Sequence, residues 1–296
     1  MQADLADKLQ AVFRPDSLGR LVRRGQGGQC RLRYEFERTD LNLEFTFSTL
    51  AKNEVEIETL PSARVEKLPI FLPTDELLSI FPGFVSLYET THLPFEGTWR
   101  DTCILLGVPL VKGARTGQIG KLLAPLEKAM GGSVVLEPSG RFYLRLPSGN
   151  MEMHMVAEGL RKLATIAQLI ANGSLLDQGY LFWDEPEANL NPKIVRIVAR
   201  TILELAGNGI QIFIATHSLF LMRELHILQQ SEFRKLDSRC FGLHPGPQGE
   251  ATIQQGRSMD DIGGIAALDE DLQQSDRYVA TETGAAFTHT NGTGEE

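Results

Sequence analysis

The chain has 296 residues, 42% of them hydrophobic, so it is long enough to bury a sizeable core as one large domain or two lobes. Its 29 Lys and Arg residues against 38 Asp and Glu residues give a formal net charge of -9, which argues against nonspecific nucleic-acid binding over the whole surface. No apolar stretch reaches the roughly 20 residues of a membrane helix, and no secretory signal is recognisable. These features predict a cytoplasmic globular protein with no membrane partner.

The first 62 residues predict a helix followed by a small antiparallel β-subdomain. Residues 1–20 have the pattern of helix and turn, and segments 29–37, 41–48 and 54–60 alternate apolar and polar residues as strands do. An arginine cluster in this region is interpreted as part of a salt-bridged sheet surface, with DNA contact as the alternative, because acidic residues share the same strands. The cluster consists of Arg23, Arg24, Arg31 and Arg33.

Residues 63–150 predict a return strand and a helical lid. The run 68–73 predicts a buried strand, and Thr74 is placed to cap a helix over 74–81 that Pro82 would kink or end. Segment 84–126 carries scattered aromatic residues and is interpreted as the lid, with a short helix at 121–130. Segments 134–137 and 141–146 then predict a hairpin leading into a strand at 151–155.

Residues 151–228 hold the segments on which the functional interpretation depends. Gly159 opens an amphipathic helix that ends at Asn172 and Gly173. Free backbone amides at a helix start attract phosphate. Taken alone, an ordinary core helix is the simpler interpretation, but its position shortly before an acid pair favours a binding role.

The acid pair Asp184 and Glu185 directly follows an apolar run at 180–183. Continuous apolar residues are typical of a strand that is covered on both faces, and open α/β sheets bind ligands at the carboxyl ends of their strands. After the pair, Asn191 can cap a helix and Pro192 can start it. Each feature alone has a simpler structural explanation; together they favour a site.

A second strand is predicted at 210–215, followed by His217. The order strand, helix, strand predicts a right-handed βαβ unit whose strand ends meet at one edge of the sheet. We therefore expect Asp184, Glu185 and His217 to converge there.

These segments resemble the ABC-type ATPases, in the DEPExxLxP form found in SMC, OLD and related AAA-type ATP-binding proteins. Residues 184–192 resemble their Walker B motif and D-loop, and residues 215–218 resemble their switch histidine segment. Residues 155–163 resemble the ABC signature, which in these families often contains SEGxR. The three motifs occur in the family's order and span about a quarter of the chain.

The resemblance implies a role for each matching residue. Asp184 would orient Mg²⁺, Glu185 would polarise the attacking water, and His217 would contact the γ-phosphate of ATP. The remaining nucleotide-binding candidates lie in the signature, in the D-loop and beside the switch histidine. They are Ala157, Glu158, Gly159, Arg161, Asn189, Asn191 and Ser218.

Two substitutions depart from the family pattern. Ala157 replaces the usual signature serine, so one hydroxyl contact is absent, and Asn191 replaces the Asp common in transporter D-loops. Arg161 and Lys162 are near enough in sequence to screen phosphate charge. The resemblance implies a homodimer that encloses ATP through signature and D-loop, with a separate effector protein and DNA as open partners.

No GxxxxGK[ST] segment occurs in the chain, although the family binds the phosphates of ATP with this motif. The segment 116–122 and the glycines at 25–28 are the nearest decoys, and both predict loops. The family places the missing strand and P-loop ahead of the antiparallel subdomain. We therefore expect a longer ATPase shortened at its N-terminus, with loss of hydrolysis as the alternative.

A helix is predicted at 219–228, and the final segment, 229–296, predicts a hairpin at 240–243 and 251–254 and a disordered tail from 281 onward. Its acidic pairs could suggest a nuclease, as in OLD proteins, but about 70 residues are too few for that domain. We interpret these acids as a solvated face or helix start.

The predicted fold is therefore α/β: an ABC-type P-loop NTPase sheet flanked by helices, with an antiparallel β-subdomain and a helical lid, and with the N-terminal strand and P-loop missing. The predicted function is an ATP-hydrolysing dimer switch acting in DNA maintenance or phage defence. The alternatives are a non-hydrolysing dimerisation or regulatory module and, less favoured, a transporter energiser.

Overall fold

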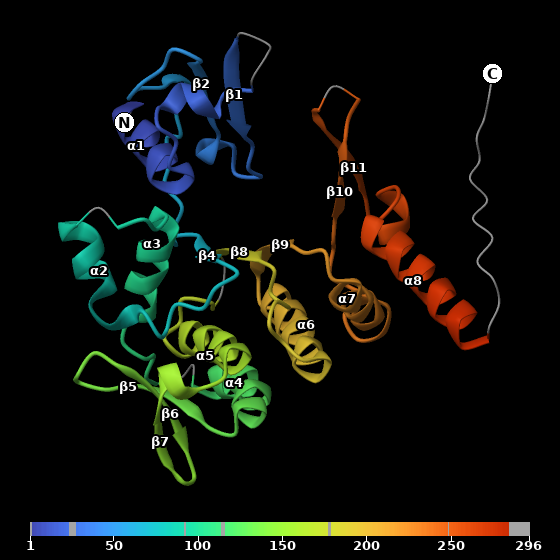
Figure 1. Ribbon diagram of the computed structural model, residues 1–296. Coiled ribbons are helices and arrows are strands. Elements are labelled where there is room, and N and C mark those ends of the chain that lie inside the picture. Colours follow the sequence, from blue (N-terminus) through green and yellow to red (C-terminus); the bar gives the residue numbers. More distant parts are fainter. Residues whose placement is uncertain are drawn as a thin grey trace. The chain divides into compact units, whose positions relative to one another are not determined.

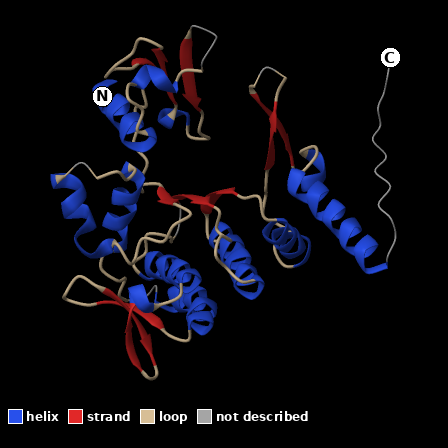
Figure 2. Cartoon of the chain, in the orientation of Figure 1, coloured by secondary structure: helices blue, strands red, loops and turns tan. Residues whose placement is uncertain are grey.

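The computed structural model describes residues 2–23, 28–91, 93–113, 116–176, 179–247 and 249–283. It has a mixed α/β fold with eight α-helices and four small sheets among these residues, as the sequence predicts (Figures 1 and 2). The chain forms two compact units, Met1–Ala215 and Thr216–Glu296. The four-segment division expected from the sequence stays a prediction.

The N-terminal part of unit 1 is the predicted helix and antiparallel sheet. Helix α1 (Gln2–Phe13) is followed by β1 (Gln29–Tyr34), β2 (Leu43–Ser48) and β3 (Glu56–Thr59), which pair in the order β1-β2-β3. Their apolar side chains form a core of their own, and Arg31 pairs with Glu44 and Glu58 on the sheet surface. The core residues are Ala6, Leu18, Val22, Phe45, Phe47 and Val55.

The salt-bridged surface is thus confirmed where the structure describes it, since Arg33 also pairs with Glu35 at 2.6 Å. Arg24 and the glycines at 25–27 lie outside the described residues.

The region interpreted from the sequence as a lid contains α2 (Phe81–Thr90), α3 (Gly97–Leu106) and α4 (Thr116–Met130). The helix predicted at 74–81 is wrong: residues 74–80 form bends and turns, and α2 begins only at Phe81. Pro82 and Gly83 do interrupt the helix, because both have non-helical backbone angles. The predicted helix at 121–130 starts five residues earlier, so the 116–122 segment is helical and the predicted loop there is wrong.

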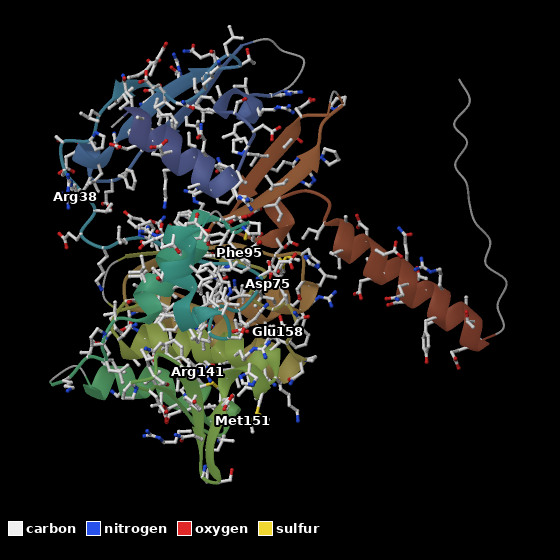
Figure 3. All side chains as sticks on the ribbon, turned by 60° about the vertical axis from the view of Figure 1, so that its left-hand side comes forward. Arg38, Asp75, Phe95, Arg141, Met151 and Glu158 are labelled. Carbon is white, nitrogen blue, oxygen red and sulfur yellow. The ribbon has the colours of Figure 1, made fainter. Side chains whose placement is uncertain are left out.

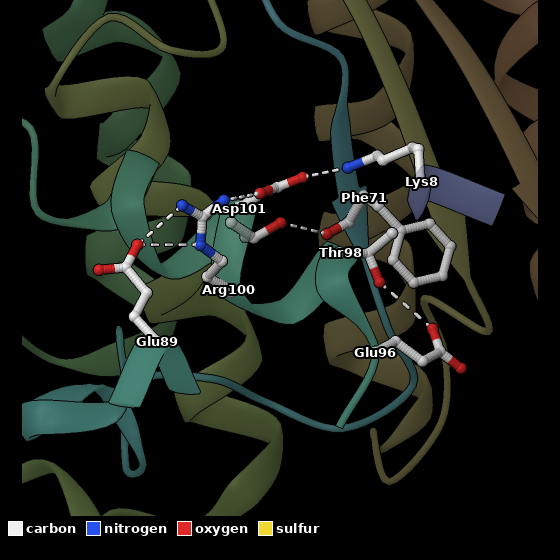
Figure 4. A network of polar contacts seen from close by, with 8 residues as sticks. Lys8, Phe71, Glu89, Glu96, Thr98, Arg100 and Asp101 are labelled. Atoms are coloured by element: carbon white, nitrogen blue, oxygen red, sulfur yellow. Dashed lines mark hydrogen bonds and ion pairs between the residues drawn. The ribbon is translucent and has the colours of Figure 1, made fainter. Parts of the chain in front are cut away.

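Polar contacts bind the lid to α1 and to the adjacent strand β4 (Ile70–Leu72). Asp101 of α3 pairs with Lys8 of α1 and with Arg100, which in turn binds Glu89 of α2 at 2.8 Å (Figure 4). The hydroxyl of Thr102 donates to the Phe71 carbonyl at 2.6 Å. These contacts connect three lid and subdomain helices to the strand that leads to the candidate site.

A three-stranded antiparallel sheet follows the lid. Its strands are β5 (Ser133–Leu136), β6 (Phe142–Leu146) and β7 (Gly149–Glu152), so the predicted hairpin is confirmed. The predicted strand at 151–155 is only half right, because β7 ends at Glu152 and a 3-10 turn (Met153–Met155) follows. This turn leads directly into the signature segment.

The central sheet is parallel and has the order β4-β8-β9. Strand β8 (Gly179–Asp184) pairs with β4 and with β9 (Ile210–Ala215), and α6 (Pro192–Gly207) connects β8 to β9. This confirms the predicted βαβ unit. Helices α5 (Glu158–Ala171) and α6 both lie beneath this sheet in the view of Figure 1.

Unit 2 contains α7 (Leu219–Ser231), the hairpin β10 (Cys240–Pro245) and β11 (Ala251–Gly256), and α8 (Ala266–Thr283). The predicted helix and hairpin are confirmed, and the acids at 269–271 lie on exposed first turns of α8. Residues 281–283 are helical, and the rest of the predicted tail lies outside the described residues. Among the described helices, none has the length and apolar character needed to cross a membrane.

Candidate functional site at the carboxyl end of the parallel sheet

The acid pair stands where the parallel strand β8 ends. Asp184 is the last residue of β8, and the amide of Glu185 donates to the Ala215 carbonyl of β9 at 2.9 Å. Glu185 has a φ of 44°, a left-handed conformation that is uncommon for residues other than glycine. Such conformations cost energy and often occur at functional sites. The chain therefore turns sharply at the residue proposed to position water.

Thr74 brings a third polar group to this strand end. It follows β4, which is parallel to β8, so both strands end at the same edge of the sheet. Its hydroxyl donates to Asp184 Oδ2 at 3.2 Å. The sequence suggested only a helix-capping role for Thr74, and that interpretation is wrong, because no helix starts there. Its position directly after an apolar, proline-bounded strand is the signal that could have identified it.

The D-loop is a compact turn that ends in the predicted helix cap. The amide of Ala188 donates to the Glu185 carbonyl at 3.0 Å, and Asn189 has a φ of 62°. Asn tolerates this conformation better than most residues. Asn191 caps α6, because its side-chain oxygen accepts from the amides of Lys193 and Ile194 at 3.0 and 3.1 Å. The cap predicted from the sequence is confirmed, whereas nucleotide contact by Asn189 or Asn191 stays a prediction.

The signature turn (residues 157–159) opens α5 and packs directly on the D-loop (residues 185–191). Ala157 is the N-cap residue, and the first amides of a helix have no partner within the helix. The side chain of Asn189 donates to Glu158 Oε1 at 2.7 Å. A Cβ at Gly159 would lie 2.9 Å from the Asn189 carbonyl oxygen and 2.8 Å from the side chain of Leu190. Glycine is therefore required here by the close approach of two backbone segments.

Lys162 makes a second contact between α5 and the D-loop. Its ammonium donates to the Ala188 carbonyl at 2.9 Å, and the residue is only 5% exposed. Burial lowers the pKa of Lys162, while the surrounding carboxylates, led by Glu158 and Asp75, act in the opposite direction (Figure 3 labels these two). The Lys162 ammonium is thus buried close to several carboxylates.

Arg161 is engaged within the protein as well. Its Nε atom lies 2.7 Å from Glu76 Oε1, and another guanidinium nitrogen donates to the Val156 carbonyl at 2.8 Å. Both cations thus have partners within the protein. Phosphate screening by Arg161 and Lys162 stays a prediction. Glu76, which the sequence suggested only as part of a helix cap with Thr74 and Asp75, is the residue that the structure adds here.

The donor atoms at the strand end suit a hard divalent cation. Mg²⁺ is bound by oxygen atoms, commonly one or two carboxylates together with substrate phosphates and water. Asp184, with the Thr74 hydroxyl beside it, provides oxygens of this kind. Within the described ranges, no group of three or more His, Cys, Asp or Glu residues could hold a metal ion by itself. Coordination of Mg²⁺ by Asp184 stays a prediction.

A small cavity of about 10 Å³ lies behind this edge. It is bordered by Leu72, Asp75, Glu76, Lys162 and Trp183. Its size is about the minimum for a single water molecule.

His217 and Ser218 are the second and third residues of the second unit, which begins directly after β9. Ser218 caps α7, because its hydroxyl accepts from the amide of Leu221 at 3.3 Å. The predicted convergence of His217 with Asp184 and Glu185, and the nucleotide contact of Ser218, stay predictions.

Residues 107–223 match the family model described as AAA domain, putative AbiEii toxin, Type IV TA system. The chain resembles the ABC-like P-loop ATPases. The matched segment runs from the end of α3 into α7, so it includes the signature turn, the acid pair, the D-loop and His217. No curated protein matches the chain.

Solved structures of SMC heads and an ABC cassette are similar to the chain at low identity. The SMC head domain from Thermotoga maritima is 13% identical with a TM-score of 0.43, covering 76% of this chain and 72% of that one. An SmcHead bound to the C-winged helix domain of ScpA is 13% identical with a TM-score of 0.48, covering 87% of each chain. MJ1267, an ATP-binding cassette of an ABC transporter, is 14% identical with a TM-score of 0.34, covering 70% of this chain and 68% of that one.

Proposed function

We propose that the chain is part of an ABC-like ATPase that hydrolyses ATP to ADP and phosphate and acts as a nucleotide-driven dimer switch. The observation that carries the proposal is the junction of two motifs at the end of a parallel sheet. The acid pair ends β8, and the D-loop that follows it is bonded to the signature turn through Asn189 and Glu158 at 2.7 Å. This contact supports the proposal, because it links the segment after the acid pair to the start of α5.

The proposed roles follow from charge and position. Asp184 orients Mg²⁺ together with bound water and the nucleotide phosphates. Glu185 accepts a hydrogen bond from the attacking water and aligns it with the γ-phosphate, while His217 contacts that phosphate. The β8 end, with Thr74 holding Asp184 at 3.2 Å, supports the first of these roles.

The signature turn would serve a nucleotide bound mainly by a second subunit. Ala157 has no hydroxyl, so the turn offers the first amides of α5 together with the helix dipole. These groups favour an anion, and Gly159 keeps them close to the D-loop. We therefore propose a head-to-tail dimer that encloses ATP, with an effector on a separate chain and DNA maintenance or phage defence as its setting.

The test is ATP turnover by the product of the gene extended upstream in frame, so that any P-loop there is included. Glu185→Gln keeps the size of the side chain but removes the base, so we expect turnover to fall by roughly a hundredfold or more while ATP binding persists. The variant should also accumulate as an ATP-bound dimer in size-exclusion chromatography.

The matched control is Glu54→Gln, the same substitution at an exposed position of the β-subdomain, which should keep full turnover. Turnover by Glu185→Gln equal to that of the unmodified protein would remove Glu185 from its proposed role.

A second candidate, a non-hydrolysing dimerisation or regulatory module, is favoured by one observation: no GxxxxGK[ST] segment occurs in these 296 residues. For this chain by itself we expect weak or undetectable ATP binding, because the P-loop contributes a large part of the phosphate contacts in such ATPases. Micromolar binding of ATP to this chain in calorimetry would contradict that expectation. A transporter energiser is the least favoured alternative.

A further inference from the structure

The ion pair between the buried Glu76 and the partly buried Arg161 joins two segments that lie far apart in the sequence. Glu76 belongs to the turn segment after β4, and Arg161 belongs to the first turn of α5. The Arg161 Nε atom lies 2.7 Å from Glu76 Oε1, and the two side chains are 20% and 4% exposed. Water screens such a pair poorly, so the attraction between the two charges is strong.

Each partner is also anchored to its own segment. The Ser79 amide donates to Glu76 Oε2 at 3.2 Å, and the Ser79 hydroxyl donates to Glu76 Oε1. Arg161 donates to the carbonyl of Val156, the residue before the N-cap of α5, at 2.8 Å. The pair therefore connects the backbone of 76–79 to the backbone of the signature turn.

The segment that carries Glu76 also touches the acid at the end of β8. Two residues before Glu76, the Thr74 hydroxyl donates to Asp184 Oδ2 at 3.2 Å. Residues 74–79 thus contact Asp184 at one end and the signature turn at the other. The D-loop also connects the end of β8 to the start of α5. The Asn189 side chain donates to Glu158, and the Lys162 ammonium donates to the Ala188 carbonyl.

We infer that Arg161 is a positioning residue, which acts through Glu76 to keep the signature turn in register with the Asp184 end of β8. The inference deepens the proposed ATPase site and rests on it. A cation free to meet phosphate would lie at the surface with few protein contacts, whereas Arg161 is fixed between Glu76 and Val156. Its removal would loosen the relation between the two motifs, while the acid pair and the backbone amides at the start of α5 remain in the chain.

The experiment is hydrogen exchange followed by mass spectrometry on the full chain without nucleotide. The reporting amides are those of Glu185, Ala188 and Leu190, which bond to the carbonyls of Ala215, Glu185 and Glu187. In Glu76→Gln and in Arg161→Met we expect exchange at these amides to rise about threefold to thirtyfold, the range typical of mutations that alter coupling between sites. Arg161→Lys, which keeps the charge, should restore part of the protection.

The double variant Glu76→Gln with Arg161→Met separates positioning from simple stabilisation. Removing both charges avoids leaving one buried charge without its partner, so the free energy of unfolding should recover relative to Arg161→Met. Exchange at the three D-loop amides should nevertheless stay high, because the connection is still absent. If the double variant recovered both the free energy of unfolding and the protection of the three amides, the ion pair would only stabilise the fold, and the inference would be overturned.

Thr74→Val tests the other end of the connection. Because it interrupts the same path, its effect on these amides should not add to that of Glu76→Gln. Arg145→Met, at an exposed position of β6, is the matched arginine control and should leave exchange unchanged. Unchanged exchange in Arg161→Met would also overturn the inference. Since no nucleotide is added, either result is independent of the turnover assay on Glu185→Gln.

Discussion

Different interactions stabilise two helices of this chain, α5 and α8. In α5 the nine residues 162–170 are all buried, including the polar residues Lys162, Thr165 and Gln168. In α8 none of the 18 residues is buried, and its acids and apolar side chains both face solvent. Local propensity and charge pairs such as Glu270 with Arg277 stabilise α8, whereas tertiary contacts on all sides stabilise α5.

The difference matters because the start of α5, which we propose to bind nucleotide, is only as well placed as the rest of the helix. The buried polar groups of α5 have partners on the lid: Gln168 donates to the Leu106 carbonyl at 3.0 Å and Asn172 to the Leu105 carbonyl at 2.8 Å. These carbonyls belong to the last turn of α3, where a helix has no internal donors left. The contacts hold the signature turn where the D-loop can meet it.

The largest expected difference comes from the same substitution in the two helices. Leu163→Ala, at a side chain that is 1% exposed, should lower the free energy of unfolding by about 2–5 kcal/mol, because it leaves a cavity in the core. Leu272→Ala, at a side chain that is 56% exposed, should change it by no more than about 0.5 kcal/mol. Urea unfolding followed by circular dichroism measures both. Equal losses would show that α8 is packed in solution.

The next prediction concerns two helical glycines. Gly159→Ala should cost about 1–3 kcal/mol, because the new Cβ meets a backbone carbonyl at 2.9 Å, and this overpacking outweighs the gain in helix propensity. Gly120→Ala in α4, where nothing lies within 4 Å, should instead stabilise by about 0.5–1 kcal/mol. Tryptophan fluorescence reports this directly, since Trp99 and Trp183 both lie in unit 1. Effects of the same sign at both glycines would disprove the close approach.

Lys162 tests the connection between α5 and the D-loop. Lys162→Met should cost about 1–2 kcal/mol near neutral pH, because the Ala188 carbonyl loses its charged donor. Lys121→Met, on the exposed face of α4, is the control and should change stability by less than about 0.5 kcal/mol.

The effect of Lys162 should also depend on pH. Burial lowers the pKa of Lys162 in the folded protein below its ordinary value of 10.5. The unfolded chain therefore binds more protons between these two values, and stability rises with pH in that window. Relative to Lys162→Met, the native protein should gain stability as the pH rises towards 10.5. A difference that stays constant or falls over this range would contradict the buried position of the ammonium.

The smallest effect is expected at the cap of α6. Asn191→Ala removes the oxygen that accepts from Lys193 and Ile194 and should cost about 1 kcal/mol. Asn191→Asp keeps an acceptor near the positive end of the helix dipole and should cost little or nothing. Thermal unfolding of the two variants side by side is the measurement, and an equal loss in both would show that side-chain capping contributes little here.

Much of the fold could be predicted from the sequence because its signals are local. Strand β8, the cap at Asn191, helix α6 and strand β9 follow from an apolar run, a capping residue, a proline start and a second apolar run within the 37 residues from Gly179 to Ala215. The helix expected at 74–81 failed for a physical reason. Thr74 and Glu76 are residue types that often cap a helix. In the structure the Thr74 hydroxyl donates to Asp184, and the Glu76 carboxylate accepts from Ser79 and pairs with Arg161.

The sequence by itself determined which residue types stand at the end of β8 and at the start of α5, since periodicity and capping chemistry act over a few residues. Only the tertiary structure decided that Arg161 pairs with Glu76, that Thr74 touches Asp184 and that Gly159 lies against Asn189. These contacts join segments 30 to 110 positions apart, and no local pattern specifies which of many polar partners a side chain will meet once the core has packed.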